Sequence, residues 1–400
     1  MKRREFLKLA AGATAAAMCP LKGCAHPSPS RQRAYRRPGS GPSAKVFLAG
    51  TGTACSEQAV KLAVRACAEA ATDFSWLSRG DAVFIKPVVN SGNPYPATTS
   101  PIAVAAMIEL LREKGAGRVV VGDMSGVEHV RFSPAGCSGS SRALMESSGL
   151  ARAVTASGAE LYCFEEAGWE AFHEEAPAAG SHWKNGLMMP DILSEIQHIV
   201  LMPRCGRHVL AGSTLGLKAA VGYWRHDTRL EYHRDASTFS EKTAEGNTVE
   251  SLRTKQRLVI TAADMILATF GPDEGYVCRP ENGLVIASES VVAHDMVSLA
   301  WLLENRRIMP ASEKDGFMDT SSIVPRVGNR MVVNWLGGLR QAWASETFVK
   351  EPLAAVWDDP VLDRAFDLFG GVPEVVLEAA DDAVPEELKL RLGQMTTAPV

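Results

Sequence analysis

The sequence predicts an α/β fold with a doubly wound, mostly parallel sheet and helices on both faces. Short apolar runs such as Ile199–Met202 alternate along the chain with segments whose apolar residues have a helical spacing. Helix start signals follow several of these runs, and Ser100-Pro101 is the clearest. This alternation favours a parallel sheet. At 400 residues, the chain can form one large α/β domain or two smaller ones.

The expected strands are apolar runs that stop at turn residues. In chain order, they are Lys45–Leu48, Ala82–Ile85, Arg118–Val121, Glu160–Phe164, Ile196–Met202, Arg257–Thr261, Leu284–Ala287 and Glu374–Leu377. The expected helices begin at capping hydroxyls or have one apolar face. They are Ser56–Ala71, Ser100–Lys114, Ala143–Met145, Leu150–Val154, Ser290–Leu303 and Val361–Leu368. The pattern does not decide whether Ala262–Leu267 is a short helix or an extended strand.

The composition is ordinary for a globular protein, with 46% hydrophobic residues, 22% charged residues and a net charge of -4. This charge balance provides no broad attraction to nucleic acid or to an anionic membrane surface. We therefore expect no nucleic-acid partner.

The first residues resemble an export signal. Lys2–Lys8 (KRREFLK) is similar to a twin-arginine signal built on Arg3 and Arg4, and a small-residue apolar stretch, Leu9–Met18, follows. That stretch is far shorter than the ~20 residues that cross a bilayer as a helix. We therefore expect an exported, periplasmic or otherwise extracytoplasmic protein without a membrane span in its mature chain. The twin-arginine translocase would be its partner during export.

Two processing sites compete after this signal. Leu21–Cys24 resembles a lipobox, which would make Cys24 a lipidated N-terminus, whereas Gly23–Ala25 fits ordinary cleavage before His26. The mature protein is accordingly soluble or lipid-anchored through Cys24. The predicted organisation is a signal at 1–25, a flexible tether at 26–43, an α/β domain at 44–305, and a C-terminal extension at 306–400 packed on the same domain.

The chain has eight cysteines, and none of those beyond the leader forms a C-x-x-C pair. We therefore expect no iron–sulfur cluster and no zinc ribbon. Cys67 and Cys163 fit small buried residues. Disulfide pairing cannot be read from the spacing.

Several ordered blocks resemble the family catalogued as domain of unknown function 362, over roughly residues 45–305. They are Lys86–Asn90 (KPVVN), Thr98–Pro101 (TTSP), Val119–Gly126 (VVVGDMSG), Met202–His208 (MPRCGRH), Gly212–Gly222 and Ser288–Asp295 (SESVVAHD). The sequence departs from the family pattern at Val88, at Arg204 and Arg207, and at Glu289-Ser290. Some relatives carry iron–sulfur segments, which this chain lacks. The resemblance implies a fold and a set of positions, but no activity.

The candidate site residues follow strand ends, which share one edge in a parallel sheet. We expect His208 and Asp123 to be catalytic, since His208 titrates near neutral pH. The expected ligand-binding residues are Lys86, Asn90, Arg204, Arg207 and Lys218, whose cations suit a carboxylate or phosphate. A divalent metal ion could bind through Asp123, His208 and Asp295. These side chains should converge around one concave surface.

Other motifs carry less chemistry. Gly212–Ala219 lacks the spacing of a P-loop, and no nucleophile-elbow serine occurs. The stretch with His226 and His233 fits a solvated face better than a metal site. Asp273 is a weaker metal candidate still.

Two functions fit these features. The first is an enzyme that acts on a small anionic molecule in a cationic strand-end pocket, with or without a metal ion. The alternative is a periplasmic ligand- or metal-binding accessory protein without catalysis, which would use the same cations but need no general acid or base.

Overall fold

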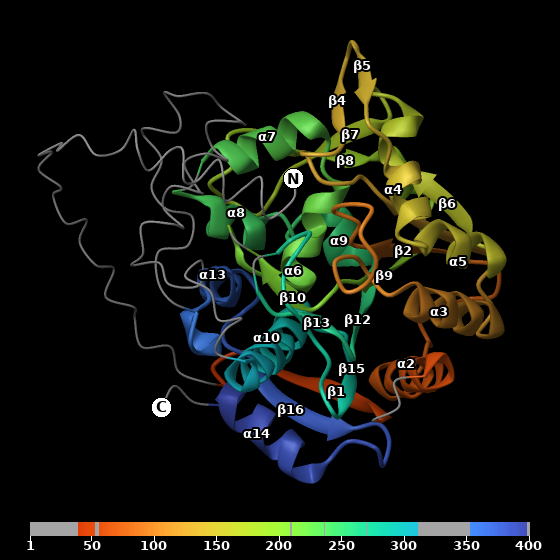
Figure 1. The fold of residues 1–400 in the computed structure, drawn as a ribbon. Coiled ribbons are helices and arrows are strands. Elements are labelled where there is room, and N and C mark those ends of the chain that lie inside the picture. The colour runs from red at the N-terminus through yellow and green to blue at the C-terminus, as the bar shows by residue number, and fades with distance from the viewer. Residues whose placement is uncertain are drawn as a thin grey trace, which may run out of the picture.

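The computed structural model describes residues 39–52, 56–208, 210–235, 237–269, 271–310 and 353–397. An eight-stranded sheet lies at its centre (Figure 1). From edge to edge, the strands are β16 (Glu374–Ala379), β1 (Ser43–Gly52), β15 (Gly283–Ser288), β12 (Gln256–Ala263), β9 (His198–Met202), β2 (Ala82–Pro87), β3 (Arg118–Asp123) and β6 (Glu160–Cys163). Within the described sheet, every pairing is parallel except those of β15 with β1 and with β12.

Helices cover both faces of this sheet, because alternate side chains of each strand point to opposite faces. Val83 and Ile85 of β2 pack in one apolar cluster with α2 (Glu57–Ala71), α3 (Pro101–Glu113) and α5 (Leu150–Ala156). Phe84, between them, packs in a cluster on the other face. There α10 (Val291–Ile308) covers the side of the sheet formed by β1 and β15. The predicted doubly wound α/β fold is therefore confirmed.

The predicted helix caps are present. The hydroxyl oxygens of Ser56, Ser100 and Ser290 each accept a hydrogen bond from the backbone N–H three residues later, at 3.1–3.3 Å. Such caps satisfy N–H groups that the first helical turn leaves without partners.

The C-terminal part of the chain completes the sheet. β16 pairs in parallel with β1, and α13 (Pro360–Leu368) contacts α8 (Phe239–Glu245). Leu388 and Leu392 of α14 (Glu386–Thr397) are buried in the same apolar cluster as α10. The predicted signal and lipidation residues Arg3, Arg4 and Cys24 lie outside the described residues.

Smaller elements surround the sheet. The remaining strands are β4 (Arg131–Ser133), β5 (Gly136–Ser138), β7 (Phe172–Glu175), β8 (Leu187–Pro190), β10 (Gly206–His208), β11 (Gly212–Thr214), β13 (Ile266–Leu267) and β14 (Val277–Cys278). The remaining helices are α4 (Ser141–Ser147), α6 (Gly216–Ala219), α7 (His226–Arg234) and α9 (Glu250–Lys255). Residues 262–267 are thus mainly extended. Among the described helices, none combines the length and the apolar character that crossing a bilayer requires.

Candidate functional site

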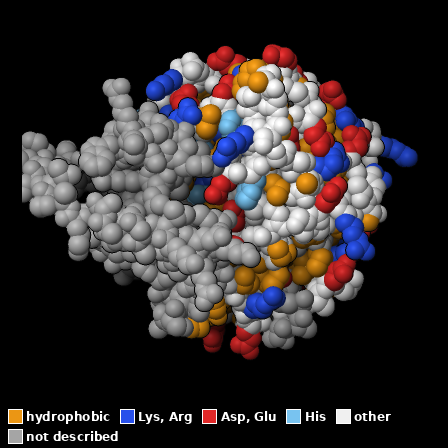
Figure 2. Space-filling model, turned by 45° about the horizontal axis from the view of Figure 1, so that its top comes forward, with side chains coloured by type: hydrophobic (Ala, Val, Ile, Leu, Met, Phe, Trp, Pro, Cys, Tyr) orange, Lys and Arg blue, Asp and Glu red, His pale blue; other side chains and the backbone are white. Residues whose placement is uncertain are grey.

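A cavity of about 150 Å³ lies at the carboxyl ends of β2 and β3. Among the residues that line it are five of those expected from the sequence: Lys86, Asn90, Asp123, His208 and Lys218. In Figure 2, basic, acidic and histidine side chains gather near the centre of the visible face, beside the grey residues. A cavity of roughly this volume holds a molecule about the size of benzene. The site therefore suits a small ligand.

Lys86 and Asp123 form a buried ion pair, because β2 and β3 are parallel neighbours, Lys86 is the next-to-last residue of β2 and Asp123 is the last residue of β3. Lys86 Nζ lies 2.8 Å from Asp123 Oδ1 and also donates to the carbonyls of Pro87 and Ala219, at 2.7 and 3.2 Å. Burial lowers the pKa of Lys86, and Asp123 opposes that shift.

Both oxygens of Asp123 are engaged. Oδ2 accepts from the backbone N–H of Val89 at 2.8 Å, and Oδ1 accepts from that of Met124 at 3.0 Å, besides its contact with Lys86. The pair therefore joins the loops after β2 and β3 to α6. Its geometry fits a role in positioning these loops better than the expected catalytic role of Asp123.

Two further residues support this junction. A Cβ atom at Gly222 would lie 2.1 Å from Asp123 Oδ1 and 2.3 Å from Lys86 Nζ, so only glycine allows the approach. Arg229 of α7 lines the cavity and donates to four carbonyls: those of Trp224, Ser125, Met124 and Gly222, at 2.6–2.8 Å. Burial lowers the pKa of Arg229 to about 10. No sequence signal points to this role, since Arg229 is one charge among many in its stretch.

His208 has a defined tautomer. Its Nδ1 accepts hydrogen bonds from the backbone N–H groups of Leu210 and Ala211, at 3.1 and 3.2 Å. Burial, and then the charge of Lys218, hold the pKa of His208 well below its usual range. A neutral ring whose Nδ1 accepts must carry its proton on Nε2. His208 is therefore a hydrogen-bond donor near neutral pH, and the expected role as proton shuttle does not fit its hydrogen bonds.

Lys218 differs from the other cations of the cavity in its side-chain partners. It extends from α6, is partly exposed, and has no hydrogen bond or ion pair among the described residues. The ring of Tyr232 lies 5.9 Å from its Nζ. Burial, followed by the charges of Arg204 and Arg229, lowers the pKa of Lys218 to about 7. The lowered pKa favours the neutral amine more than in an ordinary lysine.

His233 lies beside Lys218 in the cavity, so the interpretation of its stretch as a solvated face was wrong for this residue. Its Nδ1 is 2.8 Å from the carbonyl oxygen of Arg229, which can only accept, so Nδ1 carries the proton. Burial, and then Lys218, lowers the pKa of His233 to about 3. Its Nε2 is accordingly a hydrogen-bond acceptor and a weak base.

Three expected residues do not line the cavity. Arg204 is buried and donates to the Pro96 carbonyl and to Thr214 Oγ1, each at 3.3 Å, and burial lowers its pKa to about 10. Arg207 is buried and donates to the carbonyl of Gly212. These arginines act on the cavity through their charge and by holding β10 and β11.

Asp295 caps α6. Its two oxygens accept from the backbone N–H groups of Gly216 and Leu217, each at 2.7 Å, and Oδ1 also contacts His294 Nδ1 at 2.9 Å. The expected metal-ligand set of Asp123, His208 and Asp295 is therefore not brought together at one point. Asp123 is also next to an ammonium group, and His208 uses its Nδ1 lone pair for backbone donors.

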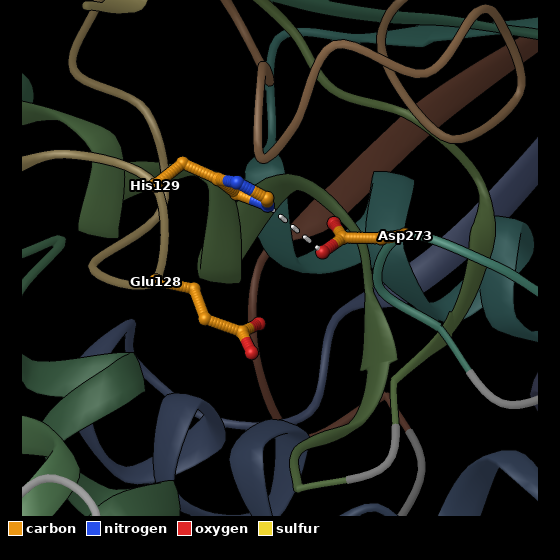
Figure 3. A group of neighbouring side chains, drawn as sticks. All are labelled: Glu128, His129 and Asp273. Carbon is orange, nitrogen blue, oxygen red and sulfur yellow. Dashed lines mark hydrogen bonds and ion pairs between the residues drawn. The ribbon is translucent and has the colours of Figure 1, made fainter. Parts of the chain in front are cut away.

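Three more side chains that line the same cavity lie close to one another: Glu128, His129 and Asp273 (Figure 3). His129 Nε2 is 3.3 Å from Asp273 Oδ2, and this hydrogen bond raises the pKa of His129. Sequence reasoning missed Glu128 and His129, although they follow the end of β3, and it ranked Asp273 below the His226–His233 stretch as a metal candidate.

The fold and the cavity define an α/β protein with a cavity outside the carboxyl ends of parallel strands. Residues 83–300 match the family described as Domain of unknown function (DUF362), and the chain belongs to this family. The resemblance noted from the sequence is therefore confirmed. No curated protein matches the chain.

Two solved structures are similar to parts of the chain. The lactate racemase apoprotein from Thermoanaerobacterium thermosaccharolyticum matches with 13% identity and a TM-score of 0.36, over 56% of this chain and 51% of that one. A Thermotoga maritima protein matches with 12% identity and a TM-score of 0.33, over 57% and 55%. This chain thus spans about half the length of each.

Proposed function

We propose that the protein is an enzyme that removes a proton from a small anionic substrate, with Lys218 as the base. The observation that carries this proposal is the unpaired amine of Lys218, whose pKa is lowered to about 7 in a cavity. A general base works best when its pKa is near the working pH, and enzymes lower lysine pKa values in this way by burial and neighbouring charge.

The charges around the cavity favour an anion. Lys86 is paired with Asp123, whereas Arg229 and Arg204 donate their hydrogen bonds to neutral oxygens. The carboxylates of Asp123 and Glu165 act on Arg229, and that of Asp273 on Arg204, through charge alone. Fixed cations in a poorly solvated cleft attract anions. A carboxylate or phosphate group would bring negative charge to this region, and the cavity volume limits the substrate to a small molecule.

In the proposed step, the substrate carries a C–H bond next to a carbonyl or carboxylate group. The Lys218 amine takes the proton and becomes an ammonium, and the electron pair of the broken C–H bond moves onto the substrate oxygen. His208 donates its Nε2–H to that oxygen as the negative charge develops. Donors arranged in advance for such a charge typically contribute about 10²–10³-fold to the rate.

The test is deuterium incorporation from D₂O into a panel of small carboxylates and phosphate esters, followed by NMR. Lys218→Met should lower the exchange rate of any active compound by about 10²–10⁴-fold. His208→Ala should lower it by about 10²–10³-fold. Lys184→Met, at an exposed lysine away from the cavity, is the matched control and should exchange at the wild-type rate.

Two results would count against the enzyme. Undiminished exchange in Lys218→Met would remove this lysine from the mechanism. Compounds that bind to the wild type in calorimetry but never exchange would favour the alternative, an accessory protein that binds its ligand without catalysis.

We also propose that the protein is exported through the twin-arginine translocase, which the Arg3-Arg4 pattern supports. Cell fractionation of the Arg3→Lys plus Arg4→Lys variant should show the protein retained in the cytoplasm, and normal export would contradict the proposal. Palmitate labelling of the wild type and of Cys24→Ala distinguishes lipidation from ordinary cleavage.

A further inference from the structure

We infer that Glu128, His129 and Asp273 bind one divalent first-row transition metal ion at the mouth of the cavity. Each of these residues offers a ligand atom, and the three atoms lie within 4.8 Å of one another. Figure 3 shows the three side chains converging from two separate loops, one after β3 and one after β13.

The distances need only a small adjustment. Ligand atoms that bind one Zn²⁺ ion at ~2.1 Å can be at most ~4.2 Å apart. Glu128 is exposed, and its long side chain can close a gap of this size without moving the backbone. His129 and Asp273 are already in contact through Nε2 and Oδ2, at 3.3 Å.

An independent observation at Asp273 points to a missing cation. Its second oxygen, Oδ1, is buried and receives no hydrogen bond from the described residues. An unsatisfied buried oxygen of a carboxylate is costly, and an ion or water that the protein recruits is the usual explanation. A cation shared with Glu128 and His129 would satisfy this oxygen and offset the negative charge of the group.

The loop after β2 holds both halves of the site in place. The Asn90 carbonyl accepts the backbone N–H of Gly126, three residues before His129, at 3.1 Å. Asn93 Nδ2 donates to the backbone carbonyl of Asp273 at 2.8 Å. Residues behind the ligands of a metal site commonly fix the ligands in this way. Asn93 is therefore a positioning residue of the proposed site.

The ligand types narrow the choice of ion. One imidazole and two carboxylates suit a first-row transition ion such as Zn²⁺, whereas Mg²⁺ and Ca²⁺ prefer ligands that are all oxygen. Three protein ligands leave at least one coordination position open. Since these residues line the same cavity as Lys218, the open position would face the ligand. The idea that a substrate anion binds between the ion and Lys218 rests on the proposed function. The binding of the ion itself does not depend on that function.

The experiment titrates Zn²⁺ into the full-length, chelator-treated protein by calorimetry and repeats the titration with Co²⁺ by visible absorption. The wild type should bind one ion. His129→Ala and the isosteric Asp273→Asn should weaken binding by at least ~10-fold, and Asn93→Ala should weaken it by about 10–100-fold. His173→Ala is the matched control, because His173 also lies between two carboxylates, Asp191 and Glu175, but away from the cavity. It should bind as the wild type does.

The experiment distinguishes binding of the metal ion from the proton-exchange activity. Lys218→Met should keep Zn²⁺ binding even where it loses proton exchange, so a failure of the proposed function leaves this result unchanged. Circular dichroism confirms that each variant is folded, and Glu128→Gln, at an exposed position, provides a variant with little risk to folding. The inference would be overturned if the wild type bound neither Zn²⁺ nor Co²⁺. It would also be overturned if His129→Ala and Asp273→Asn bound the ion with the affinity of the wild type.

Discussion

The lowered pKa of Lys218 makes a prediction about stability that needs no knowledge of the substrate. In the unfolded chain a lysine titrates near 10.5, whereas in the folded protein the pKa of Lys218 is about 7. Below pH 7 the amine is charged in both states, and the folded state bears the full cost of holding that charge in the cavity. Between pH 7 and 10.5, only the unfolded state binds the proton, so stability rises with pH. The stabilising effect is complete above pH 10.5 and is lost as the pH falls to 7.

The size of this pH-dependent stabilisation follows from the two pKa values of Lys218, 10.5 in the unfolded chain and about 7 in the folded protein. Each pKa unit of difference corresponds to ~1.36 kcal/mol. The full effect is ~5 kcal/mol, which is an upper bound because the side chain is partly exposed and solvent screens it. From pH 6 to pH 9 the expected gain is ~3 kcal/mol. Lys218→Met lacks the titrating group and keeps a similar length. It should therefore be more stable than the wild type at pH 6, and this advantage should shrink by up to ~3 kcal/mol at pH 9.

The assay is urea unfolding of both proteins at pH 6 and pH 9, with the free energies of unfolding obtained by linear extrapolation. Comparing the two proteins cancels the contributions of the other titrating groups. If the free energies of both proteins change in parallel between the two pH values, Lys218 has an ordinary pKa, and its proposed role as a base loses its physical reason.

Three further experiments test how the cavity is built. Gly222→Ala should destabilise the fold by ~1–3 kcal/mol or more in urea unfolding, because the new methyl group meets Asp123 and Lys86; wild-type stability would show that the loop moves aside. Lys86→Met should cost ~3–5 kcal/mol, whereas Lys86→Met with Asp123→Leu should cost clearly less, and additive losses would contradict a coupled pair. Asp295→Ala leaves two buried N–H groups of α6 without an acceptor, at ~1–3 kcal/mol each, and an unchanged free energy of unfolding would contradict this capping role.

Much of the fold could be predicted because its signals are local. Apolar runs marked the strands of the large sheet, and Ser56, Ser100 and Ser290 marked three helix starts that the structure confirms. The reversed direction of β15 could not be predicted, since the side-chain pattern of a buried strand is the same in either direction.

The site was predictable only in part. Neighbouring strand ends brought Lys86 and Asp123 to one cavity, as the parallel sheet requires. His208 and Lys218 reach the same cavity by another route, from β10 outside the large sheet and from α6. The roles depend on hydrogen bonds that are invisible in the sequence. Asp123 has the residue type of a catalytic acid or base, yet backbone N–H groups and Lys86 occupy its oxygens. His208 has the residue type of a proton shuttle, yet two N–H groups fix its tautomer as a donor.

The hydrogen-bond and ion-pair partners of the cations around the cavity explain why Lys218 differs from Lys86 and Arg229. Asp123 compensates Lys86, and backbone carbonyls use the N–H groups of Arg229 without removing its charge. These two residues hold the loops together, and Arg229, with Arg204 behind it, adds to the effect of burial in lowering the pKa of Lys218. The pKa of Lys218 is lowered first by burial and then by the fixed charges of Arg204 and Arg229. The residues that build the cavity thus also set the basicity of the group that faces its ligand.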